Sequence, residues 1–137
     1  METSKFQFSE PVLIDMKFHT NEDFKPVGEG KPMKVNLQIK NVIRKEREKE
    51  NAATVDVTVS MGENGSSIPF ILSITMRADF RWEEDAFSEE TVKSLLKQNA
   101  TATLLSYIRP LVATITNASP YNAYNIPYID LTKGGVE

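Results

Sequence analysis

Four stretches of the sequence alternate apolar and polar residues with a period of two, and this pattern constrains the fold most. The stretches run over residues 5–19, 33–45, 53–61 and 67–82. Because successive side chains of a strand point to opposite faces of a sheet, each stretch predicts a strand with one buried and one wet face. In the first stretch the apolar residues occupy even positions, namely Phe6, Phe8, Val12, Ile14, Met16 and Phe18. We therefore predict a four-stranded antiparallel sheet.

The connections between these strands differ in length and composition. Residues 20–32 contain Pro26, Gly28 and Gly30, which is typical of a long crossover loop. Residues 62–65 predict a short hairpin turn. The run 44–50 mixes four positive with three negative charges, so it is either a solvated hairpin tip or a patch for a partner or nucleic acid, and we favour the hairpin tip.

One long helix is predicted after the last strand. Ser88 is a suitable N-cap, and Glu89 and Glu90 follow it in the first turn, where acidic side chains suit the helix dipole. Apolar residues then recur every three or four positions as far as Ile115. Pro110 removes a hydrogen bond inside the helix, so we expect a kink at residues 106–110. The rest, residues 118–137, is expected to be extended and irregular.

Strands followed by a helix indicate an α+β fold, which we expect to form one domain over residues 1–137. A single helix covers only part of a four-stranded sheet, so apolar surface should remain exposed. Such surface usually marks a partner site. The sequence therefore predicts either an oligomer or a protein that binds apolar segments.

Several functional classes are disfavoured by the composition. The chain has 137 residues, no cysteine and one histidine, which excludes thiolate catalysis and a two-histidine zinc site. His19 lies on the predicted outward side of its strand, so we expect no enzyme, no metal and no cofactor. The net charge of −3 argues against a nucleic-acid partner, and no apolar run is long enough to span a membrane. The polar segment Met1–Glu10 lacks a signal-peptide pattern, so we expect a cytoplasmic protein.

Aromatic and aliphatic residues in loops and at element ends are the remaining candidates for a site. An apolar peptide can dock against such side chains by burial alone. The candidates are Phe24, Phe80, Trp82, Tyr121, Tyr124, Ile126 and Tyr128. The alternative is ordinary core packing, which we favour for Phe80, whereas the proline-rich segment after residue 118 cannot all be core.

Three segments of the chain resemble the SecB export-chaperone family. The helix carries a leucine and then Tyr107-Ile-Arg109 within residues 99–116, residues 125–131 read Asn-Ile-Pro-Tyr-Ile-Asp-Leu, and Asp15-Met-Lys-Phe lies near the N-terminus. The resemblance implies a homotetramer, a dimer of dimers with helices between two eight-stranded sheets. It also implies a holdase that keeps unfolded preproteins in apolar grooves and passes them to the SecA motor.

The resemblance also assigns roles to residues. Phe24, Phe80 and the segment 121–128 would line the client groove, and Asp15 would face the motor from the outer sheet surface. His19 and Ser73 stand where the family prefers acids, which weakens the expectation of SecA docking. Two hypotheses follow: a holdase in protein export, or a SecB-like adaptor dedicated to one partner, for example in a toxin–antitoxin system, that does not dock SecA.

Overall fold

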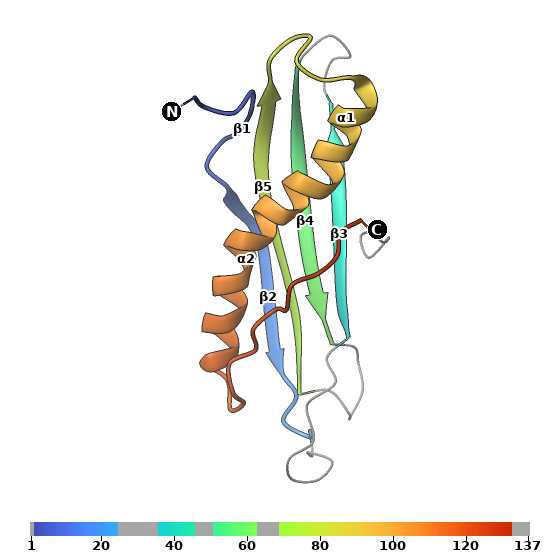
Figure 1. Cartoon of the computed structure of the whole chain (residues 1–137). Coiled ribbons are helices and arrows are strands. Elements are labelled where there is room, and N and C mark those ends of the chain that lie inside the picture. The colour runs from blue at the N-terminus through green and yellow to red at the C-terminus, as the bar shows by residue number, and fades with distance from the viewer. Residues whose placement is uncertain (1, 25–35, 46–50, 63–68, 133–137) are drawn as a thin grey trace.

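An antiparallel sheet carries one long helix across one of its faces (Figure 1). The computed structural model describes residues 2–24, 36–45, 51–62 and 69–132. The elements are β1 (Phe6–Phe8), β2 (Val12–Thr20), β3 (Leu37–Arg44), β4 (Ala52–Met61), β5 (Phe70–Trp82), α1 (Glu89–Ser94), η1 (Leu95–Asn99) and α2 (Ala100–Asn117). This arrangement confirms the predicted α+β class.

The strands lie in the order β1-β5-β4-β3, and β2 pairs with the same edge of β5 as β1 does. β1 runs beside Phe80 to Trp82, whereas β2 runs beside Phe70 to Arg77. β2 and β3 therefore occupy opposite edges of the sheet, as the predicted crossover requires. The crossover residues 25–35, the charged run from residue 46 to 50 and the turn residues 63–65 lie outside the described part of the chain.

The prediction of one continuous first strand is wrong, because the chain leaves the sheet between β1 and β2. Ser9 closes β1 by donating its N–H to the carbonyl of Asp79 at 2.8 Å and by accepting the N–H of Asp79 on its Oγ at 2.9 Å. Pro11 then has no N–H to continue a ladder. The sheet consequently has five strands rather than the four that the alternation predicted.

A β-bulge inside β2 changes which of its residues share a face. The register shifts between Leu13 and Asp15. Leu13 pairs with Met76 on the helix-bearing face, whereas Val12 pairs with Arg77 on the outer face. The extra residue of a bulge reverses the parity on one side of it. The prediction that Val12 shares a face with Phe8 and Met16 is therefore wrong.

The helix begins where the sequence predicts but contains a turn that the sequence did not reveal. The Oγ of Ser88 accepts the N–H of Thr91 at 3.2 Å, which confirms the predicted N-cap. The helix then continues from Glu89 to Asn117, and residues 95–99 form a single π-helical turn. α2 runs through Pro110, and Figure 1 shows the helix changing direction within α2, as the proline predicts. None of the helices in the described residues is long and apolar enough to cross a membrane.

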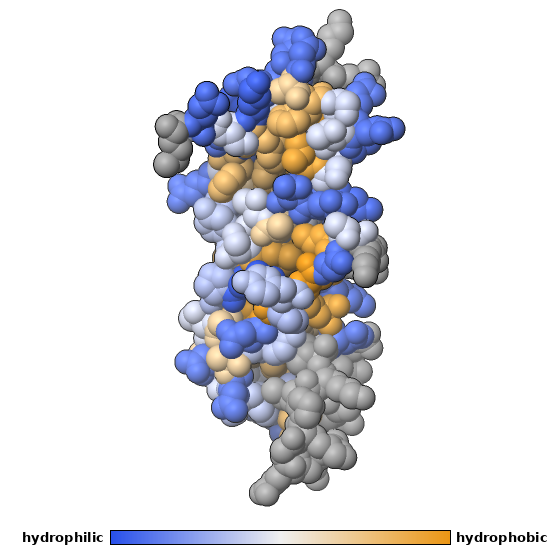
Figure 2. Space-filling view, viewed as in Figure 1, coloured by the Kyte–Doolittle hydropathy of each residue, from blue (hydrophilic) through white to orange (hydrophobic). Residues whose placement is uncertain are grey.

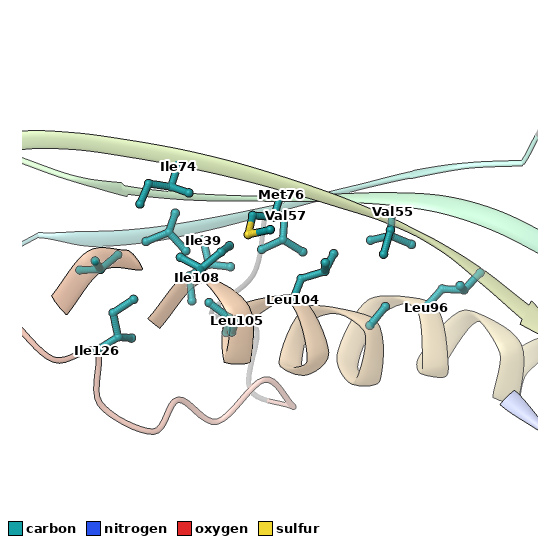
Figure 3. Close-up of a cluster of buried hydrophobic side chains, with 14 of the residues drawn as sticks. Ile39, Val55, Val57, Ile74, Met76, Leu96, Leu104, Leu105, Ile108 and Ile126 are labelled. Carbon is teal, nitrogen blue, oxygen red and sulfur yellow. The ribbon is translucent and has the colours of Figure 1, made fainter. Parts of the chain in front are cut away.

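The core lies between the helix and the two central strands (Figure 3). It consists of alternate residues of β4 and β5 together with one face of the helix. Its fully buried members include Val55, Val57, Val59, Phe70, Ile74, Phe80, Leu104, Ile108 and Val112. The edge strands β2 and β3 contribute less, so much of their apolar surface remains exposed.

Candidate functional site

A band of exposed apolar side chains follows the β2 edge of the sheet. We call it the β2 band, and it consists of Phe8, Leu13, Ile14, Met16 and Tyr107, each between 41% and 47% exposed. The rings of Phe8 and Tyr107 meet edge-to-face at 6.3 Å, which makes α2 continuous with this edge. Among the described strands β2 pairs only with β5, so its other side offers unpaired backbone groups. Exposed apolar edge strands are ready to pair with another chain.

Apolar surface is also visible on the helix-bearing face. Figure 2 shows orange apolar patches there, separated by blue polar side chains. Part of this face is covered by residues 118–132, which we call the tail segment. The tail segment follows α2, has no helix or strand, and runs back beside the helix in front of β4 (Figure 1).

The start of the tail segment is tied to the end of β2. The hydroxyl of Tyr121 donates to the carbonyl of Asn21 at 3.1 Å. The rings of Tyr121 and Phe24 meet edge-to-face with their centroids 5.4 Å apart. The structure therefore brings together two of the predicted site residues, Phe24 and Tyr121, and both are half-buried.

The middle of the tail segment inserts a side chain into the core. The N–H of Tyr124 donates to the Oγ1 of Thr116 at 2.8 Å. Two residues later, Ile126 is only 7% exposed. Figure 3 shows its side chain pointing toward Leu105 and Ile108 of α2. The predicted residues Tyr124 and Ile126 are thus turned inward, against the molecule's own core.

Arg109 of α2 holds the backbone of the tail segment. Its Nη2 donates to the carbonyl of Pro127 at 3.0 Å. Its guanidinium lies 5.1 Å from the ring centroid of Tyr128, whose side chain is 96% exposed. The Nε of Arg109 is buried and has no hydrogen-bond partner among the described residues. Our candidate residues did not include Arg109, although it lies in the leucine–aromatic–arginine pattern of the helix.

Phe80 and Trp82 lie apart from the other predicted site residues. They stand at the end of β5 that pairs with β1, whereas Asn21 donates to the carbonyl of Pro69 at the other end. Phe80 is fully buried, and Phe6 stacks on it with the ring centroids 5.5 Å apart. The Nζ of Lys45 lies 5.5 Å from the centroid of the Trp82 ring. A ligand would have to displace β1 to reach Phe80.

The outer face of the sheet, opposite the helix, is not acidic. At its centre, Asp56 accepts the Nε of Arg77 at 2.7 Å and the Nη2 of Arg44 at 2.9 Å. The hydrogen bond from Arg77 is the main reason why the pKa of Asp56 lies below its usual value. By register, the described strands place five basic residues on this face, Lys17, Lys40, Arg44, Arg77 and Arg81, against the acidic residues Asp15, Asp56 and Asp79.

The described residues contain no group of three or more histidine, aspartate or glutamate side chains that could hold a metal ion. His19 is exposed on the outer face opposite Ile71. What the geometry provides is apolar surface, a buried side-chain donor on α2, the guanidinium of Arg109, and an extended segment lying against it. Such features bind polypeptide by burial and main-chain hydrogen bonds.

Comparison with known proteins gives a structural likeness but no sequence family. No protein-family model and no curated protein matches the chain. A SecB-like chaperone from Mycobacterium tuberculosis, solved in complex with a ChAD peptide from an antitoxin, superposes with a TM-score of 0.72 at 14% identity over 91% of each chain. A protein of unknown function from Streptococcus agalactiae superposes with a TM-score of 0.50 at 12% identity, over 93% of this chain and 100% of that one. The chain therefore has the fold of a SecB-like chaperone.

Proposed function

We propose that the protein is a chaperone that holds non-native polypeptides by their exposed apolar segments. The observation that carries the proposal is the apolar surface left uncovered beside a single helix, in a fold that a peptide-binding chaperone shares. The M. tuberculosis structure with its antitoxin peptide supports a polypeptide as the ligand. The clients that the sequence resemblance implies are preproteins in protein export, and we propose that the protein binds them in the cytoplasm.

Such binding needs neither catalysis nor a cofactor. A protein that binds the unfolded state of its client shifts the client's folding equilibrium by mass action. Full burial of one aliphatic or aromatic side chain contributes about 1.5–3 kcal/mol, so a few contacts give useful affinity without strict sequence specificity. We propose that Phe24, Trp82, Tyr121 and Tyr128 contribute to client binding, together with Phe80 if β1 moves. Tyr124 and Ile126 are turned inward, so we propose that they take part in client binding only through movement of the tail segment.

We propose further that the protein assembles as a homotetramer, a dimer of dimers. The β2 band supports a first contact in which β2 edges of two copies pair and extend the sheet. Pairing would satisfy the open backbone groups of β2 and bury side chains such as Leu13 and Met16. A partner at this edge explains why an otherwise ordinary sheet exposes so many apolar residues on one strand.

The second candidate function is an adaptor for one dedicated partner, such as a toxin–antitoxin system, without docking to SecA. The outer face favours the adaptor. Of the acidic residues that the resemblance leads us to expect for motor docking, Asp15 is present on this face, and the basic residues Lys17 and Arg77 lie near it. The central Asp56 is already neutralised by two arginines. A basic partner would therefore meet more positive than negative side chains on this surface.

Suppression of aggregation tests the holdase. The purified protein is mixed with a chemically unfolded client at ratios from equimolar to tenfold excess, and light scattering is followed after dilution. An inert folded protein of similar mass serves as the control. Suppression near stoichiometric ratio supports the holdase, whereas no suppression at tenfold excess overturns it. A pull-down that recovers a single stoichiometric partner supports the adaptor instead.

A further inference from the structure

We infer that the tail segment occupies a binding site for an extended apolar peptide, and that a client segment binds by displacing it. The inference rests on the proposed function and identifies where on the helix-bearing face a client binds. It also changes the role of the predicted residues Tyr124 and Ile126, because they become the resident ligand of the site rather than its walls.

The tail segment is held by side-chain contacts, as a bound peptide is, and not by backbone pairing within the sheet. No backbone–backbone hydrogen bond joins residues 120–131 to any other described residue. The segment is fixed instead by the inserted side chain of Ile126, by side-chain contacts from Thr116 and Arg109, and by the contacts of Tyr121 with Asn21 and Phe24. A strand of the sheet such as β5 differs, because β4 on one side and β1 and β2 on the other together pair it from Phe70 to Trp82. Segments with few backbone hydrogen bonds open at low free-energy cost, so the tail segment is suited to leave and return.

Three contacts define what the site recognises. The Oγ1 of Thr116 accepts a backbone N–H, the core beside α2 buries an aliphatic side chain two residues later, and the Nη2 of Arg109 donates to the carbonyl of the next residue. Two of the three contacts are made to main-chain atoms, which every polypeptide offers. Tyr121, Tyr124, Ile129 and Leu131 of the tail segment also pack against the core, partly buried. The ligand class is therefore an extended segment with one fully inserted aliphatic residue and further apolar side chains beside it.

The unpaired Nε of Arg109 gives a further reason for exchange. A buried donor without a partner costs free energy that a better-placed carbonyl recovers. The tail segment accepts a hydrogen bond from the Nη2 of Arg109 but none from its Nε. A client peptide can shift along the site until one of its carbonyls also accepts the Nε. Because the tail segment is part of the same chain, it competes at a high effective concentration, and only a client that binds the site well displaces it.

The experiment compares full-length wild type with Ile126→Ser, which weakens the tail segment but leaves the site's walls intact. Val92→Ala is the matched control, since it removes buried aliphatic atoms from α1, away from the tail segment. The probes are a labelled synthetic peptide of residues 119–132 and a permanently unfolded, reduced and alkylated client protein, both followed by fluorescence anisotropy. Circular dichroism verifies that each variant is folded. If Ile126→Ser does not fold, Tyr121→Ser replaces it, because this change detaches the start of the tail segment from Asn21 and Phe24.

We expect Ile126→Ser to bind both probes at least tenfold more tightly than wild type, and unlabelled tail peptide to compete with the client. Val92→Ala should stay within twofold of wild type, since its tail segment is unchanged. If the client binds but Ile126→Ser does not tighten this binding, and the tail peptide does not compete with the client, the inference is overturned and the proposed function stands. If the tail peptide binds but the unfolded client does not, the proposed function is overturned, and so is the inference that a client displaces the tail segment. Failure of the folded variant to bind the tail peptide shows that there is no exchangeable site.

Discussion

Substitution of Leu13 by lysine tests whether the β2 edge is an assembly surface. Leu13 is 47% exposed, so a contact that buries it completely gains about half of the 1.5–3 kcal/mol that full burial of a leucine contributes. In a two-fold symmetric contact the change occurs twice, which gives a loss of about 2 kcal/mol before the charge is considered. Burying an unpaired ammonium adds at least about 1 kcal/mol, so the total of about 3 kcal/mol corresponds to a dissociation constant raised about 100-fold.

The assay is the mass in solution by light scattering, measured over a concentration series for wild type and Leu13→Lys. The matched control is Ile43→Lys, which places lysine at a 38% exposed isoleucine on the opposite edge strand, β3. We expect Leu13→Lys to dissociate at concentrations where wild type and Ile43→Lys remain assembled. A wild-type monomer at all concentrations, or equal dissociation of both variants, would refute the reasoning that β2 is the pairing edge.

Three further predictions concern the residues that position the helix and the outer face. Asn41→Leu removes the Nδ2 that donates to the carbonyl of Leu96 at 3.2 Å and to the Oγ1 of Thr101 at 2.7 Å, so urea unfolding should show a loss of about 1–3 kcal/mol; unchanged stability would mean that neither oxygen needs this donor. The pKa of Asp56 is lowered chiefly by its hydrogen bond from Arg77, so the unfolded state binds the proton more readily and stability is lost as the pH falls below about 4. Asp56→Asn should flatten this pH dependence between pH 7 and 3, and an unchanged slope would assign it to other carboxylates. Ser88→Ala should lower the free energy of unfolding by about 0.5–2 kcal/mol through loss of the N-cap, and a thermal midpoint equal to wild type would contradict this.

The centre of the fold could be predicted from the sequence because burial there is one-sided. In β4 and β5 one face packs on the helix and the other meets water, so the alternation of Val55, Val57 and Val59 with polar residues correctly identifies the buried face. The same reasoning placed the N-cap at Ser88, because a capping side chain acts on backbone only three residues away. Local signals of this kind survive tertiary folding unchanged.

The sequence does not predict the β-bulge in β2, because apolar and polar residues do not alternate where the bulge lies. Val12, Leu13 and Ile14 are consecutive apolar residues, and any of them fits the buried parity. Only the pairing with β5 shows that Leu13 faces the helix and that the register shifts before Asp15. Cross-strand contacts decide such a shift, and they are not encoded in the spacing of one strand.

The π turn at residues 95–99 can be explained, once the structure is known, by the spacing of the buried residues along the helix. Buried residues recur every four positions from Val92 to Thr116, and each four-residue step overshoots an α-helical turn of 3.6 residues by about 40°. A regular helix would carry this stripe away from the sheet. The π turn accommodates one extra residue and returns the stripe to the core, and Asn41 of β3 donates to a carbonyl within it.

The tail segment was expected to be irregular, but its position against the core was beyond sequence reasoning. Its residues Tyr121 to Leu131 carry no period, so nothing in the spacing distinguishes a client-binding wall from a segment that is itself bound. Burial of Ile126 makes that distinction, because a side chain already packed against Leu105 and Ile108 cannot receive a ligand. Arg109 shows the same limit, since its partner is a backbone carbonyl 18 residues away.

The β2 band and the tail segment share no residue, and this bears on how one small chain both assembles and binds. The β2 band follows the free edge of β2, whereas the tail segment begins beside the end of β2 and runs in front of the sheet toward β3 (Figure 1). Pairing of two copies at β2 would therefore leave the site under the tail segment open, and the two surfaces need not compete. Leu13→Lys should then abolish assembly while each monomer still binds the tail peptide when Ile126 is replaced. Loss of both activities in Leu13→Lys would mean that the client site is completed by the second copy.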